Sequence, residues 1–324
     1  MIPEGGRGVC LVRKNIGGTL YTLVYGKVVA LAMDPIEKKP LFHFYPGTKI
    51  LSYATAGCNF KCLFCQNWSI SQVPPENVPA KDISPPEMVD LALRFGSIGV
   101  AHTYTEPTVF YEYARDVGLL AREKGLVNVF VTNGYFTRDV LKDMKGWLHA
   151  ANVDLKGDAE FYRRVVGGAD VEVVRRNIKD LYKAGIHVEV TTLIIPGYND
   201  DPEWYRAFVI DFLRSISPDI PLHITRFHPD YKMRDVPPTP VETLVRLREL
   251  ALEEGMHYVY LGNVADPKYE TTYCPNCGAP VIERHMYHVR VRLEGDRCPY
   301  CGQRIKVVGV RGTQGNSTTA FSPP

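Results

Sequence analysis

An alternation of strand-like and helix-like segments runs through most of the 324-residue chain and limits its fold more than any other feature. The predicted strands are short apolar runs, and several predicted helices close at a glycine, as at Gly125, Gly185 and Gly255. Parallel strands need such crossover helices, so the alternation predicts an α/β fold with a parallel sheet or partial barrel. The predicted strands are residues 49–54, 98–104, 127–132, 151–155, 186–195 and 222–227, and the predicted helices are residues 84–94, 107–124, 137–147, 171–184, 201–215 and 241–254.

A polar motif lies at the carboxyl end of each of these six strands. Because the carboxyl ends of parallel strands meet at one end of the sheet, the six motifs are expected on a single rim. Enzymes built as barrels of this kind place their chemistry on that rim. In chain order the motifs are residues 57–67, 103–108, 132–134, 154–157, 196–200 and 226–229.

Three cysteines in the first motif, Cys58, Cys62 and Cys65, have the spacing CxxxCxxC. Their odd number excludes a closed set of disulfides, so the spacing predicts metal ligands. A structural zinc would need a fourth protein ligand, whereas a 4Fe–4S cluster can be held by three cysteines with one iron left open for an exogenous ligand. A partial zinc knuckle or buried structural thiols are the alternative.

Two CPxCG sequences near the C-terminus predict a second metal site. Cys274 and Cys277 form one pair, and Cys298 and Cys301 form the other, so four thiolates can close a tetrahedron around zinc. Residues 281–293 alternate in polarity and are expected to supply the hairpin of a zinc ribbon. Structural zinc is the main prediction, with mononuclear iron or an auxiliary iron–sulfur cluster as alternatives, because ligand softness does not separate these metals.

The regions outside the alternation are predicted to form smaller units. Residues 8–13 and 20–31 are expected to be short strands, with a turn at Gly17 and Gly18, and the proline- and aromatic-rich residues 34–47 form a loop. The predicted parts are a β segment with a packed loop at 1–47, a partial (β/α)6 barrel at 48–268, a four-cysteine zinc-ribbon-like module at 269–312 and a disordered tail at 313–324.

The composition is typical of a soluble enzyme. Apolar residues make up 45% of the chain, no apolar run approaches the ~20 residues of a membrane span, and the net charge is only +2. The N-terminus lacks a basic-then-apolar leader, so a cytoplasmic protein with reduced, metal-bound thiols is expected. Between Cys274 and Thr313 seven Lys/Arg face three Asp/Glu. An acidic partner or nucleic acid is therefore not excluded, although a solvated face is favoured.

The sequence from Cys58 to Cys65, with Phe64 before the last cysteine, resembles the signature of the radical S-adenosylmethionine (SAM) superfamily. The resemblance implies that the amino and carboxylate groups of SAM bind the open iron of a 4Fe–4S cluster. One electron from the cluster would then break the sulfonium C–S bond, giving methionine and a 5′-deoxyadenosyl radical that abstracts hydrogen from a substrate. A low-potential electron donor of the ferredoxin or flavodoxin type is the expected partner.

Five longer stretches resemble the radical SAM member of the AmmeMemoRadiSam group, which is related to pyruvate formate-lyase activating enzyme. The resemblance extends from about residue 8 to residue 312 and implies a six-unit open barrel that functions alongside Memo and Ammecr domain proteins. Fuller members carry extra cysteines before the position of Cys10, so Cys10 is not assigned a metal. The five stretches are residues 34–41, 65–67, 103–108, 153–157 and 195–200.

The same resemblance implies a role for single residues on the rim. Glu106 matches a glutamate that contacts the SAM amino group, although Tyr104 and Thr105 stand where the activating enzymes have glycines. Lys156 matches a lysine that binds the SAM carboxylate, and His228 matches a histidine at the SAM ribose. Taken singly, Lys156 and His228 would be read as ordinary surface residues, but their shared rim favours the functional interpretation.

Four further residues complete the predicted cofactor site. Asp154 and Thr132 match positions near the SAM carboxylate. Phe64 precedes the last cysteine, and Asn133, which with Gly134 is equally consistent with a simple turn, follows the third strand.

The main functional prediction is therefore a radical SAM enzyme whose substrate the sequence does not identify. Activation of a glycyl radical enzyme is the alternative reaction. A non-catalytic metal-binding module that recruits nucleic acid is a further alternative. The rim motifs favour the enzyme, because a binding module has no use for an open iron and a carboxylate-binding lysine.

Overall fold

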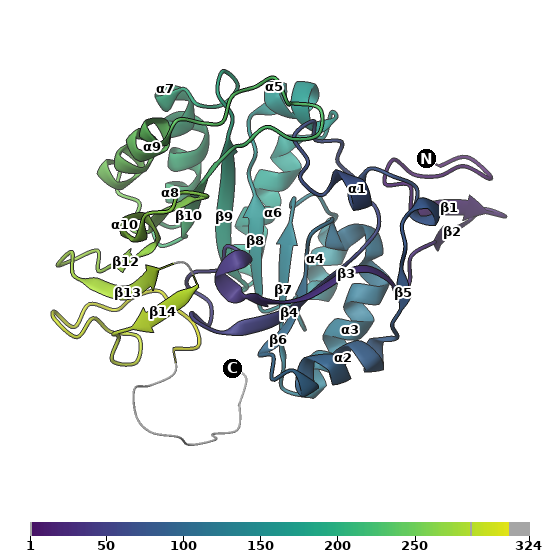
Figure 1. Ribbon diagram of the computed structural model, residues 1–324, viewed down its shortest axis with the longest axis horizontal. Coiled ribbons are helices and arrows are strands. Elements are labelled where there is room, and N and C mark those ends of the chain that lie inside the picture. The colour runs from purple at the N-terminus through teal and green to yellow at the C-terminus, as the bar shows by residue number, and fades with distance from the viewer. Residues whose placement is uncertain (1, 286, 311–324) are drawn as a thin grey trace.

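The computed structural model describes residues 2–285 and 287–310, and a nine-stranded sheet with the order β11-β10-β9-β8-β7-β6-β4-β3-β5 forms its centre (Figure 1). Every neighbouring pair from β4 to β11 is parallel, whereas β3 pairs antiparallel with both β4 and β5. The strands are β3 (Lys27–Pro35), β4 (Lys49–Thr55), β5 (Lys81–Asp82), β6 (Gly99–His102), β7 (Val127–Thr132), β8 (Ala150–Asp154), β9 (His187–Ile194), β10 (Leu222–Arg226) and β11 (Val259–Gly262).

The crossover helices follow the predicted alternation. The prediction of β7 is confirmed residue for residue, and α2 begins after a capping box in which Ser84 and Glu87 bond to each other's backbone. The main helices are α2 (Pro85–Arg94), α3 (Tyr111–Glu123), α4 (Arg138–Met144), α6 (Val171–Lys183), α8 (Asp211–Ile216) and α9 (Val241–Glu253), and shorter ones are α1 (Trp68–Ser71), α5 (Ala159–Phe161), α7 (Pro202–Tyr205) and α10 (Pro267–Glu270).

Two predicted helices and the number of parallel strands differ from the structure. The helix predicted over residues 107–124 opens with a 3-10 turn, Pro107–Phe110, and becomes α-helical only from Tyr111. The helix predicted over residues 201–215 contains a π-helical turn, Arg206–Ile210, between α7 and α8. The prediction of six parallel strands omitted β11, a four-residue strand that follows the last predicted helix.

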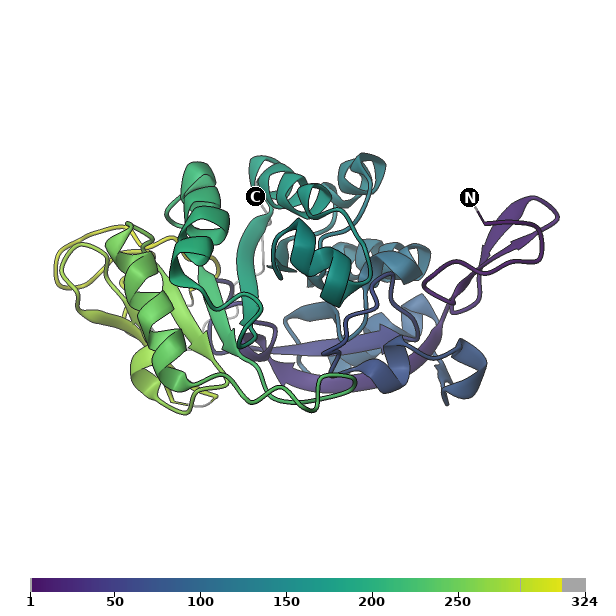
Figure 2. The ribbon, with the colours of Figure 1, turned by 90° about the horizontal axis from the view of Figure 1, so that it is seen from above.

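The N-terminal strands also have different bounds from those predicted. The turn at Gly17 and Gly18 is confirmed, but it joins β1 (Arg13–Ile16) to β2 (Thr19–Thr22) in a hairpin that projects from the body (Figure 2). Residues 8–12 are not a strand, because Leu11 turns back on Gly8 with a φ of 68°. The strand predicted over residues 20–31 is divided by a turn at Gly26 into β2 and β3, and β3 belongs to the main sheet.

The segment between β3 and β4 packs on one face of the sheet. Ile36, Leu41 and Phe44 pack against Ile50 of β4 and against small and apolar side chains of β6, β7 and β8. The carboxylate of Glu189 on β9 accepts hydrogen bonds from the backbone N–H groups of residues 42 and 43, at 3.0 and 2.7 Å. This segment, residues 36–45, is called the strap below.

The four-cysteine module packs against the strap and β11. It contains β12 (Thr272–Tyr273), β13 (Pro280–His285) and β14 (His288–Val291), so the predicted hairpin is present within residues 280–291. The Arg284 side chain is fully buried, donates to the Phe42 carbonyl at 2.6 Å, and stacks 4.3 Å from the Phe42 ring centroid. The module therefore shares a core with the sheet. The tail predicted at 313–324 lies outside the described residues.

Within the described part of the chain, no helix combines the length and the apolar character needed to cross a bilayer.

His43 of the strap is buried and neutral. Its ring lies between the Lys306 carbonyl, 2.7 Å from Nδ1, and the Tyr260 hydroxyl, 2.5 Å from Nε2, so Nδ1–H donates and Nε2 accepts. Burial lowers the pKa of His43 to about 4, and the nearby Glu189 carboxylate only partly opposes this effect.

We expect the free energy of unfolding to decrease as the pH falls below about 6.5, the pKa of an unperturbed histidine. Unfolded His43 gains a proton there, whereas folded His43 stays neutral down to about pH 4, so about 3 kcal/mol is lost across this interval. Denaturant titrations at several pH values measure the slope. His43→Gln should flatten it, and an equally steep curve in that variant would contradict the assignment.

Candidate active site

The cysteine loop, residues 57–67, leaves the carboxyl end of β4 and is fixed by its neighbours. Backbone N–H groups of Lys61 and Leu63 donate to Val166 and Val165, at 2.8 and 3.0 Å, and these carbonyls belong to a π-helical turn after β8. Gly57 starts the loop with a φ of 96°, and a Cβ there would lie 2.6 Å from a Val12 side-chain carbon. The backbone of the loop therefore requires glycine at this position.

The three cysteine sulfurs lie in a largely buried setting. Cys58 Sγ is 3.4 Å from the Phe60 N–H, and Cys65 Sγ is 3.2 Å from the Ser71 hydroxyl. Burial raises the pKa of Cys58, and it raises that of Cys62 to about 12. The thiolate forms of these two cysteines therefore need a positively charged partner close to their sulfurs.

Two asparagines tie both ends of the cysteine loop to neighbouring rim loops. Asn59 Oδ1 accepts a hydrogen bond from Asn133 Nδ2 at 2.7 Å, and Asn67 Nδ2 donates to the Tyr104 carbonyl at 2.7 Å. Asn133 follows β7, and Tyr104 follows β6. The first three polar motifs are thus in direct contact, as their positions after parallel strands predict.

Glu106 joins the β6 and β7 loops from a fully buried position. Its carboxylate accepts from the Thr108 backbone and hydroxyl at 3.1 and 2.8 Å, from the Thr132 hydroxyl at 2.9 Å and from the Asn133 N–H at 2.8 Å. Burial raises the pKa of Glu106, although these hydrogen bonds oppose the increase. Most acceptor positions of this carboxylate are already in use.

Tyr104 has a left-handed backbone, with a φ of 62°, which is rare for a bulky residue. Its hydroxyl donates to the Asp34 carboxylate, and its ring centroid lies 4.3 Å from Lys39 Nζ. Lys39 Nζ is 2.6 Å from Asp34 Oδ2, and both side chains are buried. Burial alone would raise the pKa of Asp34, but hydrogen bonds from Lys39, Tyr104 and Lys38 hold it well below its usual range.

The sequence did not predict that Asp34 and Lys39 contact Tyr104 of the rim. Residues 34–47 were expected to form a loop packed against the following domain, with no contact assigned to any charged side chain. The sequence did contain a signal, since two acidic residues and two lysines lie within a segment that is otherwise mostly apolar and aromatic.

Lys156 lies at the end of β8 with Asp154. Its Nζ is 2.7 Å from Asp154 Oδ2 and 5.5 Å from the Phe64 ring centroid, and only 12% of its side chain is exposed. Burial lowers the pKa of Lys156, but Asp154 and Cys62 outweigh burial and the net shift is upward. The group therefore stays cationic beside the cysteine loop.

His228, at the end of β10, contacts the cysteine loop from the exposed side. Its Nε2 is 2.8 Å from the side-chain nitrogen of Gln66, which donates when the histidine proton is on Nδ1. Asn199, from the loop after β9, donates to the Lys156 carbonyl at 2.9 Å. Polar residues from all six predicted motifs therefore meet on one rim.

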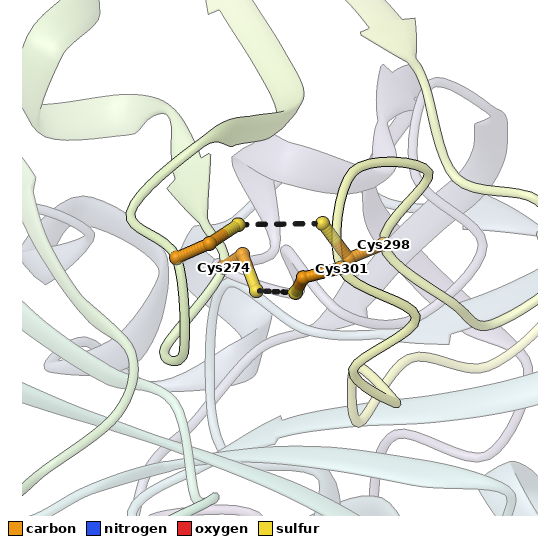
Figure 3. A group of neighbouring side chains, drawn as sticks. Cys274, Cys298 and Cys301 are labelled. Carbon is orange, nitrogen blue, oxygen red and sulfur yellow. Dashed lines mark hydrogen bonds between the residues drawn. The ribbon is translucent and has the colours of Figure 1, made fainter.

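The four C-terminal cysteines converge at a second place. Their Sγ atoms all lie within 4.8 Å of one another, and the sulfurs of Cys274 and Cys301 are 3.5 Å apart, while those of Cys277 and Cys298 are 3.7 Å apart (Figure 3). Four sulfurs at these distances can hold one metal ion in a closed site.

The Radical SAM superfamily model matches residues 52–208, which contain the cysteine loop and the rim motifs of β6, β7 and β8. This chain belongs to the radical SAM superfamily. The members of that superfamily are enzymes that use a 4Fe–4S cluster and SAM. An uncharacterized protein of Methanocaldococcus jannaschii is 51% identical to this radical SAM chain, over 95% of the chain and 92% of that protein.

Two more distant likenesses each extend over more than two thirds of the chain. A probable GTP 3′,8-cyclase of Thermococcus kodakarensis is 26% identical over 72% of this radical SAM chain and 80% of its own length. The structure of Streptococcus suis SuiB bound to S-adenosylmethionine has a TM-score of 0.51 and 12% identity, covering 68% of this chain and 50% of SuiB. At that identity the structural likeness shows the fold alone.

Proposed function

We propose that this radical SAM enzyme cleaves SAM reductively at a 4Fe–4S cluster held by Cys58, Cys62 and Cys65. The proposal rests on the cysteine loop, which presents three sulfurs at the carboxyl end of β4. Hydrogen bonds between this loop and the loops after β6 and β7 hold it in place. When bound, the cluster supplies the electron and SAM supplies the 5′-deoxyadenosyl radical for hydrogen abstraction.

The residues around the loop have separate tasks in this proposal. Lys156 binds the SAM carboxylate through its permanent charge, Asp154 orients the Lys156 ammonium, and the Phe64 ring shields that ammonium from water. His228 provides a polar group at the exposed side for the ribose.

Glu106, Thr132 and Asn133 form the opposite side of the proposed SAM site. The carboxylate of Glu106 fixes the Thr132 hydroxyl and the Asn133 backbone, so an ammonium group of SAM would replace one of these donors. We therefore propose that Glu106 both positions the β7 loop and accepts from the SAM amino group.

Anaerobic reconstitution with iron and sulfide tests the proposal. The expected result is a visible absorption band that dithionite bleaches, followed by release of 5′-deoxyadenosine from SAM. Absence of both from folded protein would contradict the proposed reaction and favour a binding module.

Membership of the AmmeMemoRadiSam group is proposed from the five sequence stretches described above. On this basis the partial-barrel cytoplasmic enzyme would receive electrons from a ferredoxin or flavodoxin and would work with Memo and Ammecr domain proteins. Incubation of the reduced enzyme with SAM and cell extract, followed by mass mapping, tests for the substrate. A glycyl radical signal in that experiment would instead identify an activating enzyme.

We propose that the four-cysteine site holds zinc with a structural role. Its four sulfurs surround a position between two tight turns, and Cys274 and Cys298 are buried. Elemental analysis of protein purified without added metal should give one zinc per chain. One iron per chain, or iron with sulfide, in a variant lacking Cys58, Cys62 and Cys65 would assign the site to one of the alternatives.

The hydrogen bond from Asn133 to Asn59 allows a test of whether the β7 loop holds the cysteine loop in place. Asn133→Ala removes the donor to Asn59 Oδ1, so we expect a loss of about 1–3 kcal/mol in loop stability. Iron content after a fixed exposure to a chelator should therefore fall faster than in the wild type. Asn77→Ala, an exposed asparagine outside the rim motifs, is the matched control. Equal rates of iron loss in both variants would contradict a clamping role.

A further inference from the structure

A cavity of about 510 Å³ opens at the amino ends of the parallel strands. Its lining includes Val127, the first residue of β7, His149 before β8, His187 at the start of β9 and Pro221 before β10. The cysteine loop follows the carboxyl end of β4, which is parallel to these strands. The cavity is therefore at the opposite end of the sheet from the proposed SAM site.

Three separate parts of the chain close around this cavity. The strap contributes Phe44 and Tyr45, the sheet contributes the strand starts, and the segment after the four-cysteine module contributes Lys306 and Val308. The strap and this last segment are joined by a backbone hydrogen bond of 2.8 Å from Tyr45 N–H to the Val308 carbonyl. The strap therefore lines this cavity, and the proposed reaction at the rim does not involve the cavity.

The walls are mainly apolar and aromatic. The Phe44 ring lies 4.9 Å from the Tyr45 ring and 5.6 Å from the His187 ring, measured between centroids. Tyr182 and Ile186 line the cavity from the end of α6 and from just before β9. A cavity of this size and lining suits a ligand with a planar ring better than a small inorganic ion.

The charged groups at the cavity are mostly cationic. Arg122, Lys145 and Lys306 line it from three different segments, and none has an ion-pair partner among residues 2–285 and 287–310. One carboxylate, Asp219, also lines the cavity, but it is 2.7 Å from His257 Nδ1 and thus already has a partner. Burial, with the Arg122 charge as a smaller cause, lowers the pKa of His149. The described lining therefore has uncompensated positive charge.

We propose that this cavity is a second binding site, which takes an anionic ligand bearing a planar ring, of the nucleotide class. The aromatic and aliphatic walls take the ring, and Arg122, Lys145 and Lys306 bind the phosphates. A bound nucleotide would connect the sheet to the strap and to the segment after the four-cysteine module.

Calorimetric titration of the full, cluster-loaded protein tests the site with ATP, adenosine and tripolyphosphate as probes. We expect ATP to bind at least about tenfold more tightly than either part alone, because the ring and the phosphates use different walls. Loss of two phosphate-binding cations in Lys145→Ala/Lys306→Ala should weaken ATP binding about tenfold or more. Lys142→Ala, which removes an exposed lysine of α4 paired with Asp139, is the control and should bind as the wild type does.

The competing outcomes are separated by Lys156→Ala, which alters the proposed SAM site at the other end of the sheet. ATP binding that is lost in Lys156→Ala but kept in Lys145→Ala/Lys306→Ala would overturn the proposal by placing ATP in the SAM site. Tripolyphosphate that binds as tightly as ATP, or no ATP binding to the wild type, would overturn it as well. None of these results depends on whether SAM is cleaved.

Discussion

Replacement of any one of Cys58, Cys62 and Cys65 by alanine is expected to remove the iron–sulfur absorption and all SAM cleavage. A cluster with three protein ligands loses its anchorage when one ligand is removed. Burial raises the pKa values of the Cys58 and Cys62 thiols, which favours their neutral form once no cluster is bound. The fold should survive, because neutral thiols are tolerated in a buried setting. Iron, sulfide and 5′-deoxyadenosine are the quantities to measure.

Cys10→Ala is the matched control for these variants. Cys10 is also a buried cysteine, and its carbonyl oxygen is 2.7 Å from where a Cβ of Gly57 would lie, so it is a neighbour of the same loop. It should keep the full iron and sulfide content. All four variants should also keep the zinc that is proposed for the four-cysteine site. Survival of the absorption in the three loop variants would disprove the cluster assignment, and its loss in Cys10→Ala would add Cys10 to the site.

Lys156→Ala is expected to weaken SAM binding about ten- to hundredfold while leaving the cluster in place, because one charge-assisted hydrogen bond of roughly 1.5–3 kcal/mol is lost. Lys156→Arg should recover only part of the affinity, since a planar guanidinium does not occupy the position of a compact ammonium. The perturbation of the reduced cluster's electron paramagnetic resonance spectrum by added SAM provides the titration. The same titration of Lys142→Ala, a surface lysine of α4, controls for the lost charge.

The contact between Lys156 and Asp154 makes a double-mutant test possible. In Lys156→Ala the Asp154 carboxylate loses its partner and could itself repel the SAM carboxylate. If Lys156 binds SAM directly, the substitution must weaken SAM in an Asp154→Asn background as well. An effect that disappears in that background would mean that Lys156 only neutralises Asp154. Unchanged affinity in both backgrounds would show that the predicted role is mistaken.

The sequence predicts the parallel sheet well because the apolar runs and the capping residues repeat along the chain. It fails where a strand lies outside the alternation of strands and long helices, or where one backbone angle decides the bounds. β11 is followed only by the four-residue α10, and the N-terminal strand bounds depend on the left-handed Leu11 and on the turn at Gly26. Neither the backbone angle of Leu11 nor the turn at Gly26 produces a periodic pattern in the sequence.

The contacts within the candidate site were likewise only partly predictable from the sequence. That the rim motifs meet could be predicted, because parallel strands bring their carboxyl ends together. The contacts of Asp34 with Lys39 and Tyr104 could not, because Asp34 and Tyr104 are 70 positions apart and meet only through an unusual backbone conformation of Tyr104. The saturation of the Glu106 carboxylate by local donors likewise depends on exact loop geometry that residue types do not specify.

The left-handed backbone of Tyr104 has a consequence for the interior of the sheet. Glycine would adopt this conformation without strain, whereas a tyrosine there costs on the order of 1 kcal/mol. In return the ring covers a buried pair of opposite charges, Asp34 and Lys39, and keeps water away from it. Attraction between charges weakens several-fold when water replaces protein around them. The tyrosine therefore covers a buried pair of opposite charges at the level of Ile50 on β4, and a glycine would leave that pair without its covering ring.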